Sequence, residues 1–151
     1  AILHRIGGEN EEGECKFEDV PSGADYEKAV AWASTNGIVA GISATEVNPN
    51  ADITREQMAA ILYRYANYKK IDTQVGDNTN ILSYDDYNDI SEYEIPSMQW
   101  AADSRLMVGK TDITLNPKDN ATRAEAAAVF MRFVENFNDK NNRPIKNAGS
   151  I

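Results

Sequence analysis

Apolar residues recur three and four positions apart in several segments of the chain, which is the spacing of one face of an amphipathic helix. The clearest stripes are Tyr26, Ala29, Val30 and Ala33; Met58, Ile61, Leu62 and Tyr65; and Ala126, Val129, Phe130 and Phe133. A fourth helix is expected from about Tyr93 or Pro96 to Leu106. Asn36 and Gly37 provide a stop after the first stripe, because glycine accepts the left-handed conformation that ends helices. The pattern predicts an all-α fold of paired helices.

The helix pairs form a repeat, which becomes visible when the chain is compared with itself at an offset of 68 residues. The matches are Trp32 with Trp100, Gly41 with Gly109, Asn48-Pro49 with Asn116-Pro117, Thr54-Arg55 with Thr122-Arg123, and Arg64 with Arg132. Near the start of each copy an offset of 70 sets Phe17 to Val20 against Tyr87 to Ile90, so the second copy is expected to be two residues shorter there. A unit that cannot bury its own apolar face packs on its neighbours.

The first six residues resemble the end of the second helix in each copy, so the chain is expected to begin inside an earlier repeat. His4 then lies on a helix tail, where packing or surface exposure is favoured over a role as a ligand. The expected segments are a repeat tail at 1–6, a linker at 7–16, a repeat at 17–66, a polar linker at 67–86, a repeat at 87–137 and a loose tail or linker at 138–151.

The second helix of each copy opens on the same short motif. Thr54 precedes Gln57 by three residues, and Thr122 precedes Glu125 by three. This is the spacing of a capping box, in which the hydroxyl and the Gln or Glu side chain each accept a hydrogen bond from a backbone N–H group of the first turn. Both threonines are therefore predicted to cap a helix.

Arginine follows the threonine in both copies, as Arg55 and Arg123. A cation at the first helical position opposes the positive end of the helix dipole, so capping does not explain it. A helix N-terminus with free N–H groups and a guanidinium is suited to binding an anion. The alternative is an Arg–Asp pair that ties one copy to another.

Composition narrows the possible functions. The chain of 151 residues has a net charge of −9, which excludes a basic nucleic-acid surface and requires any anionic partner to meet a local cationic site. No apolar run is long enough to insert into a membrane. The polar stretch Asp77-Asn-Thr-Asn80 and the pair Asp85-Asp86 lack the glycine and final glutamate of a calcium loop, so no metal is predicted.

Catalytic chemistry is not indicated either. Cys15 is the only cysteine and has no plausible histidine partner, and the acidic residues show no distinctive pairing. We expect a non-catalytic protein without a cofactor.

The ordered motifs resemble the S-layer homology (SLH) repeat: Phe-x-Asp-Val, Trp-Ala, Asn-Gly-Ile-Val-x-Gly, Asn-Pro and Ile-Thr-Arg-Glu-Gln. The resemblance covers 17–65 and 87–133 in full and 1–6 as a tail. It implies tandem helix-loop-helix repeats about a pseudo-threefold axis, with the first repeat truncated here. It also implies anchoring of a bacterial surface protein, outside the cell in the wall or S-layer, to secondary cell-wall polysaccharide. The glycan is often anionic and pyruvylated, and it binds in grooves between repeats. The alternatives to such an anchor are a structural protein–protein assembly module of a surface layer and a fragment of a glycan-processing enzyme.

Carried over residue by residue, the resemblance implies ligand-binding roles for Arg55, Arg123, Asp19, Asp89, Trp32, Trp100, Gly41 and Gly109. Core packing is favoured over sugar stacking for the tryptophans, and a backbone role for the glycines. Gln57 stands where the family motif has glutamate, so the earlier site is expected to differ from the later one. A truncated first repeat leaves apolar stripes without a partner, so we expect self-association or a retained upstream segment that completes it.

Overall fold

The computed structural model describes residues 1–7, 14–76 and 80–137, which form two compact units, Ala1–Ala51 and Asp52–Ile151. The described residues are helical, as expected, and their extended pairing is limited to an isolated antiparallel bridge between Thr54 and Asn120. That bridge lies outside the loops at 41–49 and 109–117. The expected tail at 138–151 and residues 8–13 of the expected linker lie outside the described residues.

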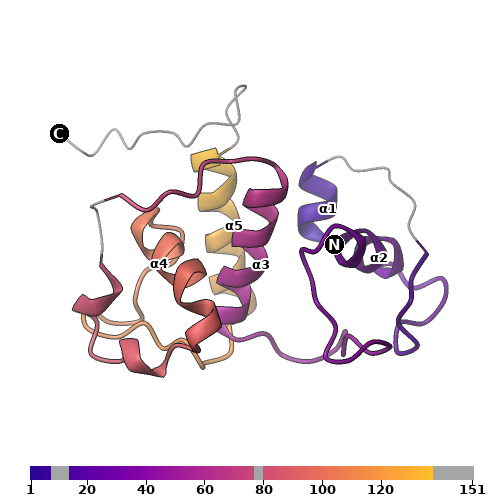
Figure 1. Cartoon of the computed structure of the whole chain (residues 1–151), viewed down its shortest axis with the longest axis horizontal. Helices are drawn as coiled ribbons and strands as arrows, with labels where there is room; N and C mark the ends of the chain where they lie inside the picture. The colour runs from indigo at the N-terminus through magenta and orange to yellow at the C-terminus, as the bar shows by residue number, and fades with distance from the viewer. Residues whose placement is uncertain (8–13, 77–79, 138–151) are drawn as a thin grey trace. The chain divides into compact units, whose positions relative to one another are not determined.

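The first unit contains α1 (Ile2–Gly7) and α2 (Glu27–Thr35), shown at the right of Figure 1. Leu3 and Trp32 are buried, and the rings of His4 and Trp32 have centroids 5.3 Å apart. Helix α2 ends as the sequence predicts, since Gly37 has a φ of 70°. His4 therefore packs against an aromatic neighbour within its unit.

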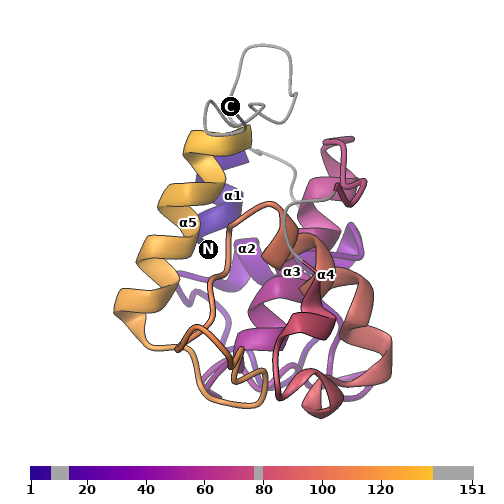
Figure 2. The same ribbon diagram turned by 90° about the vertical axis from the view of Figure 1, so that its left-hand side faces the viewer.

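The second unit contains α3 (Arg55–Tyr68), α4 (Ile95–Asp103) and α5 (Arg123–Phe137), with short 3₁₀ turns η1 (Ile81–Ser83), η2 (Tyr87–Asp89) and η3 (Glu92–Glu94). Helix α4 packs along α3, and α5 approaches both through its C-terminal half (Figures 1 and 2). Phe133 lies 5.7 Å from Tyr65 between ring centroids, and Phe137 lies 5.8 Å from Trp100. Helix α4 ends three residues before the expected Leu106, where Arg105 takes a φ of 58°.

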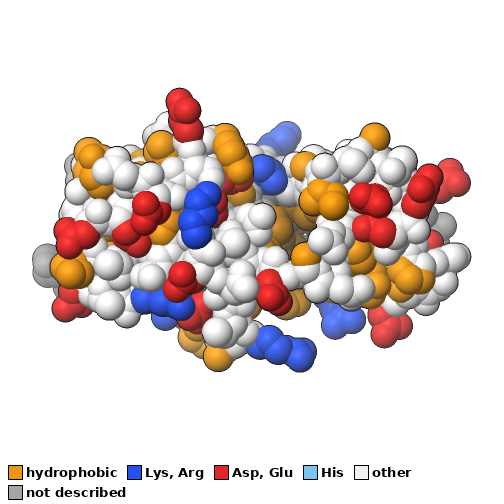
Figure 3. All heavy atoms as spheres, turned by 90° about the horizontal axis from the view of Figure 1, so that it is seen from below, with side chains coloured by type: hydrophobic (Ala, Val, Ile, Leu, Met, Phe, Trp, Pro, Cys, Tyr) orange, Lys and Arg blue, Asp and Glu red, His pale blue; other side chains and the backbone are white. Residues whose placement is uncertain are grey.

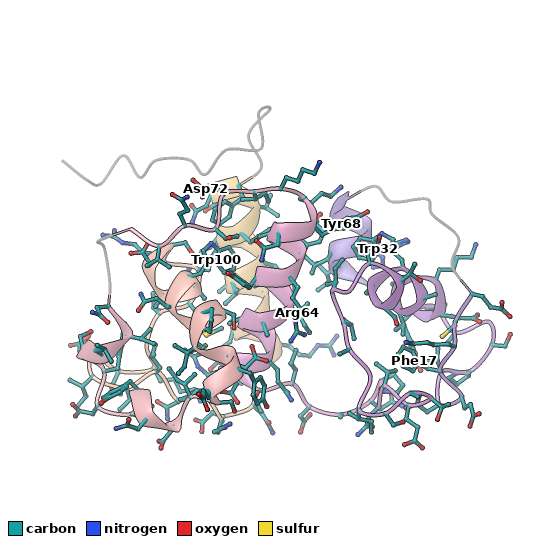
Figure 4. The ribbon with its side chains drawn as sticks, viewed as in Figure 1. Phe17, Trp32, Arg64, Tyr68, Asp72 and Trp100 are labelled. Carbon is teal, nitrogen blue, oxygen red and sulfur yellow. The ribbon has the colours of Figure 1, made fainter. Side chains whose placement is uncertain are left out.

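The pair formed by α3 and α4 repeats the pair formed by α1 and α2. Tyr63 and Trp100 have ring centroids 5.6 Å apart and an interplanar angle of 60°, and His4 meets Trp32 at 5.3 Å and the same angle (tryptophans labelled in Figure 4). Each pair joins the second helix of one copy to the first helix of the next. The units therefore divide at Ala51, inside the repeat expected at 17–66.

One aspartate fixes the long loop of each copy. In the first unit the Asp19 carboxylate accepts hydrogen bonds from the backbone N–H groups of residues 47 and 48, at 2.6–3.1 Å. In the second unit Asp86 accepts from residues 115 and 116, at 2.8 and 2.7 Å. Asp86, rather than Asp89, is thus the structural counterpart of Asp19.

The alignment that set Asp89 against Asp19 was wrong by three residues. Tyr84 to Tyr87 and Tyr87 to Ile90 both fit an aromatic-x-Asp pattern, and the aliphatic Ile90 favoured the second. The structure selects the first, because the ring of Tyr84 faces Gly109 just as the ring of Phe17 faces Gly41. With this register the segment from the aromatic residue to the tryptophan is one residue longer in the second copy, whereas the earlier alignment made it two residues shorter. Asp89 is an exposed residue of η2.

The loop glycines are required by close packing. A Cβ atom at Gly41 would collide with the carbonyl oxygens of Ser43 and Glu46 and with the Phe17 ring. At Gly109 it would collide with the carbonyls of Thr111 and Thr114. Both glycines therefore have the backbone role that the sequence favoured.

The first turn of α3 docks on the segment that precedes α5. The backbone N–H groups of Arg55 and Glu56 donate to the carbonyls of Asp119 and Pro117, at 2.9 and 3.0 Å. The Glu56 carboxylate, 4% exposed, accepts from the Ser91 backbone N–H at 2.9 Å, from the Ser91 hydroxyl at 2.8 Å and from Lys118 Nζ at 2.6 Å. The Lys118 ammonium also bonds the Ser91 hydroxyl. Glu56 therefore joins α3 to the turns on both sides of α4.

Burial works to raise the pKa of Glu56, but the hydrogen bonds from Lys118 and Ser91 outweigh it and hold the pKa below its ordinary value. A carboxylate with a lowered folded-state pKa stabilises the fold above its unfolded-state pKa, about 4.3 for glutamate. The stabilisation is then lost as the pH falls through the folded-state pKa.

We expect Glu56→Ala to lower the free energy of unfolding by about 1.5–3 kcal/mol at neutral pH, the range for hydrogen bonds to a charged group. The difference from the native chain should shrink as the pH falls below about 4. Urea unfolding followed by circular dichroism at several pH values measures both. Glu92→Ala, an exposed glutamate of η3, is the control and should change stability by less than about 0.5 kcal/mol. A Glu56→Ala deficit independent of pH would contradict the assignment.

Candidate anion-binding groove

A groove of about 250 Å³ lies in the second unit, between the start of α3, the loop after α4 and the first turns of α5. The residues that line it include Arg55, Val108, Gly109, Lys110, Glu125 and Arg132. It brings the second helix of one copy together with the loop and second helix of the next. This is the arrangement expected for a binding groove between repeats.

Arg55 lies in the wall of the groove and is 4% exposed. Its Nε donates to the carbonyl of Leu115 at 2.8 Å and its Nη2 to the carbonyl of Val108 at 2.6 Å. Its Nη1 lies 3.5 Å from Oε2 of Glu125. Two edges of the guanidinium therefore hold the loop, and the third faces the carboxylate within the groove.

The free N–H groups expected at the start of α3 are not free. Thr54 Oγ1 accepts from the Gln57 N–H at 3.3 Å, and Gln57 Oε1 accepts from the Thr54 N–H at 3.0 Å, which completes a capping box. The next N–H groups, those of residues 55 and 56, donate to the carbonyls of residues 119 and 117. Anion binding at this helix end must therefore use side chains, because the backbone donors are occupied.

Arg123 has a different environment from Arg55, although both follow a capping threonine. Thr122 and Glu125 bond reciprocally at the start of α5, at 3.1 and 3.3 Å. Arg123 is exposed and makes no hydrogen bond or ion pair with the part of the chain that the structure describes. No loop of a following copy meets it within this unit. Of the two arginines, only Arg55 is brought into the groove.

Two further cations face the groove, and the sequence analysis did not select them. Lys110 Nζ lies 3.8 Å from Glu125 Oε1 and bonds Asp119 at 3.0 Å. Arg132 donates to the Leu106 carbonyl at 3.3 Å. The repeated position shared by Arg64 and Arg132 was visible in the sequence, but Lys110 has Ile42 as its counterpart and gave no such signal.

The remaining residues selected from the sequence lie elsewhere or act through the backbone. Trp32 and Trp100 are each 2% exposed, so neither offers a free indole face to a sugar. Gly109 lines the groove, whereas Asp19 and Gly41 belong to the first unit and shape its loop. Of the residues outside the arginines, Gly109 and the capping residue Glu125 line this groove.

The wider surface is acidic, in keeping with the net charge of −9. On the face in Figure 3, Asp and Glu side chains are spread widely, and Lys and Arg form separate groups. Among the described residues, no cluster of three or more His, Cys, Asp or Glu side chains is placed to hold a metal ion. The helices of residues 1–7, 14–76 and 80–137 are all too short or too polar to cross a membrane.

Curated relatives share a segment of this kind within much longer proteins. The chain is 33% identical over 134 residues to an amylopullulanase of Thermoanaerobacterium thermosulfurigenes, covering 89% of this chain and 7% of that protein. It is 31% identical over 138 residues to the exoglucanase XynX of Acetivibrio thermocellus, covering 91% and 12%. It is 30% identical over 129 residues to a surface-layer 125 kDa protein of Lysinibacillus sphaericus, covering 83% and 10%. The chain thus spans about a tenth of these relatives.

The family model of the S-layer homology domain matches residues 16–59 and 83–127. The two matches begin 67 residues apart, which is the separation of Asp19 and Asp86, the aspartates that hold the two loops. Together they cover more than half of the chain, with the loop, the capped start of the second helix and the arginine of both copies inside them. The chain belongs to the S-layer homology domain family.

Proposed function

We propose that this chain is a non-catalytic anchoring module that binds a secondary cell-wall polysaccharide through the groove at Arg55. The observation that carries the proposal is the cationic lining of that groove, with Arg55, Lys110 and Arg132, in a chain of net charge −9. An anionic ligand is attracted to this site and repelled by most of the remaining surface. A carboxylate on a sugar, such as a pyruvyl ketal, fits this requirement.

The relatives support attachment as the shared role. Two of them are named as an amylopullulanase and an exoglucanase, and a third as a surface-layer protein. Their names describe different activities, whereas the segment they share with this chain is about a tenth of their length. A role common to all of them is holding the rest of the protein at the cell surface. We place this chain in the same location, outside the cell at the bacterial wall or S-layer.

Binding of a carboxylate would exchange one anion for another. The Glu125 carboxylate occupies the space beside Arg55 and Lys110, at 3.5 and 3.8 Å. A ligand carboxylate placed there would form charge-assisted bonds with the same two cations. Val108 and Gly109 would border the sugar ring through the backbone of the loop. Glu125 then competes with the ligand for these cations.

A pseudo-threefold arrangement of three repeats remains part of the proposal. The start of α3 is covered by the 117–119 segment of the next copy, whereas the start of α5 carries the exposed Arg123. A third repeat, from an upstream segment or from a second chain, would cover α5 in the same way and give Arg123 a groove of its own. Asp89, Trp32 and Trp100 contribute to binding only through the folded scaffold.

The second candidate is a structural module that docks to other protein chains. In its favour, Arg55 donates hydrogen bonds through Nε and Nη2 to two backbone carbonyls of the next copy and so links the two copies. The two candidates differ in whether the cell-wall polysaccharide is required for binding. An anchoring module needs the polysaccharide, and an assembly module needs only a protein partner.

Sedimentation with purified cell-wall sacculi tests this difference. We expect the chain to co-sediment with native sacculi, and to remain in the supernatant after the non-peptide polymer has been extracted. Sacculi stripped only of pyruvyl ketals should retain little of the chain if the carboxylate is what the groove binds. Equal binding to all three preparations would contradict the proposal and favour the assembly module.

Lys110→Ala should weaken binding to the pyruvylated polymer by about 10-fold or more, the range for losing one hydrogen bond to a charged group. Isothermal titration calorimetry measures the effect. Lys110 is 35% exposed on its side chain, so the fold should persist. Lys70→Ala removes an exposed cation that does not line the groove and serves as the charge-matched control. Equal losses from both variants would assign the effect to net charge instead of to the groove.

Glu125→Gln should raise the affinity for the anionic polymer, because the variant removes the competing negative charge beside Arg55 and Lys110. The helix cap should survive, since Gln57 already fills the same role in the other copy. We expect the dissociation constant to fall about threefold to tenfold at low salt. An unchanged or higher constant, with helix content intact by circular dichroism, would show that Glu125 does not face the ligand.

Arg55→Ala should lower stability, unlike the two variants above, because it leaves the buried carbonyl of Leu115 and the partly buried carbonyl of Val108 without this donor. We expect a loss of about 2–4 kcal/mol in the free energy of unfolding. Thermal and urea unfolding provide the measurement. Lys70→Ala again serves as the control and should change stability by less than about 0.5 kcal/mol. Equal stability of the two variants would show that Arg55 does not stabilise the contact between the copies.

A further inference from the structure

A second pocket, of about 190 Å³, lies on the side of the α3–α4 pair formed by residues 60–67 and 93–97. The residues that shape it are Tyr63, Arg64, Asn67, Tyr93 and Glu94. It shares no lining residue with the groove at Arg55. Its volume is below the roughly 300–1,000 Å³ of pockets for drug-sized ligands, so it suits a single ring.

Two tyrosines give this pocket aromatic walls. Tyr93 is 79% exposed, the most exposed of the large hydrophobic side chains among the described residues. Tyr63 is held by an edge-on contact with the buried Trp100, at 5.6 Å between centroids. A fixed ring and an exposed ring on opposite elements offer apolar faces with polar edges, the surface on which an amphipathic ligand packs.

The polar groups of the pocket are arranged so that their charges cancel. Arg64 of α3 (labelled in Figure 4) places Nη2 3.6 Å from Oε1 of Glu94. The Glu94 side chain is 7% exposed, and its Oε2 accepts from the Ser97 hydroxyl at 2.9 Å. Arg64 is 41% exposed, so part of its guanidinium remains accessible to a ligand. A charged ligand therefore gains no net attraction here.

A hydrogen-bond donor completes the pocket. Asn67 is exposed, and its Oδ1 accepts from the Thr73 hydroxyl at 2.9 Å, which leaves the Nδ2 group as a donor at the pocket. Together with the accessible N–H groups of Arg64 this gives donors for hydroxyl oxygens. Aromatic faces beside neutral donors and acceptors match a sugar ring, which has apolar C–H faces and a rim of hydroxyls.

We infer that this pocket binds one neutral hexopyranose or N-acetylhexosamine unit, with the ring against Tyr93 and the hydroxyls bonded to Asn67 and Arg64. The inference goes beyond the proposed groove and does not depend on it, because the lining residues and the charge of the ligand differ. The groove selects a carboxylate, and this pocket selects a neutral ring.

The pocket is particular to the α3–α4 junction. At the offset of 68 residues, Asp25 and Tyr26 occupy the positions of Tyr93 and Glu94. His4, which packs on Trp32 as Tyr63 packs on Trp100, takes the place of Tyr63. The equivalent α1–α2 pair thus has neither the two tyrosines nor the buried acid. The repeat places similar backbones at both junctions, but side chains suited to a sugar ring occur at this one.

Titration of the full chain with methyl β-glucoside and methyl N-acetyl-β-glucosaminide, followed by backbone amide shifts in NMR spectra, tests the inference. We expect saturable shifts around 63–67 and 93–97 and none around 108–110. Tyr93→Ala should raise the dissociation constant by about threefold to tenfold, whereas Tyr93→Phe, which keeps the ring, should retain most of the affinity. Lys110→Ala should leave this binding unchanged.

Tyr87→Ala, which removes another exposed tyrosine of the second unit, is the matched control and should not alter the titration. Methyl β-glucuronide should bind no more tightly than the neutral glucoside. The absence of shifts around 63–67 at tens of millimolar of both neutral sugars would overturn the inference. Tighter binding of the glucuronide, or saturation of the same residues only by a proline-rich peptide, would do so as well.

Discussion

Docking of the first turn of α3 on the next copy is the constraint on which the second unit depends. The backbone N–H groups of residues 55 and 56 find acceptors in residues 117–119, and the Arg55 guanidinium finds them in Val108 and Leu115. A buried cation is costly unless its donors are satisfied, and these carbonyls satisfy them at fixed positions. The loop after α4, the groove and the register of the two copies all follow from this one attachment.

Features set by neighbours in the chain could be predicted from the sequence. Thr54 and Thr122 accept bonds from residues three positions ahead, and Gly37 ends α2 with a positive φ. Helices α3 and α5 begin at the predicted caps and α2 ends just before the predicted glycine, whereas α4 ends before the expected Leu106. The 68-residue repeat was also visible in the sequence, because Trp32 and Trp100 and the motifs around them recur at one offset. Each of these properties depends on a few adjacent residues.

Features set by distant partners could not be predicted in the same way. Arg55 and Arg123 follow the same local motif, yet one is buried by a loop more than fifty residues away and the other is exposed. The choice between Asp86 and Asp89 likewise depended on which aromatic ring could reach Gly109, a contact across the loop. Lys110 enters the groove without a counterpart in the first copy. Local sequence does not encode whether such a partner is present.

The three nitrogens of the Arg55 guanidinium have different partners. This explains how Arg55 can join the two copies and also be a candidate contact for a ligand. Its Nε and Nη2 groups are committed to carbonyls, which fixes the plane of the group, and Nη1 alone faces Glu125 in the groove. A donor held in place by the scaffold loses little conformational entropy when a ligand binds, so rigidity gained for folding also favours binding. Glu125 keeps that donor paired when no ligand is bound. The interaction that joins the copies therefore also prepares the site between them.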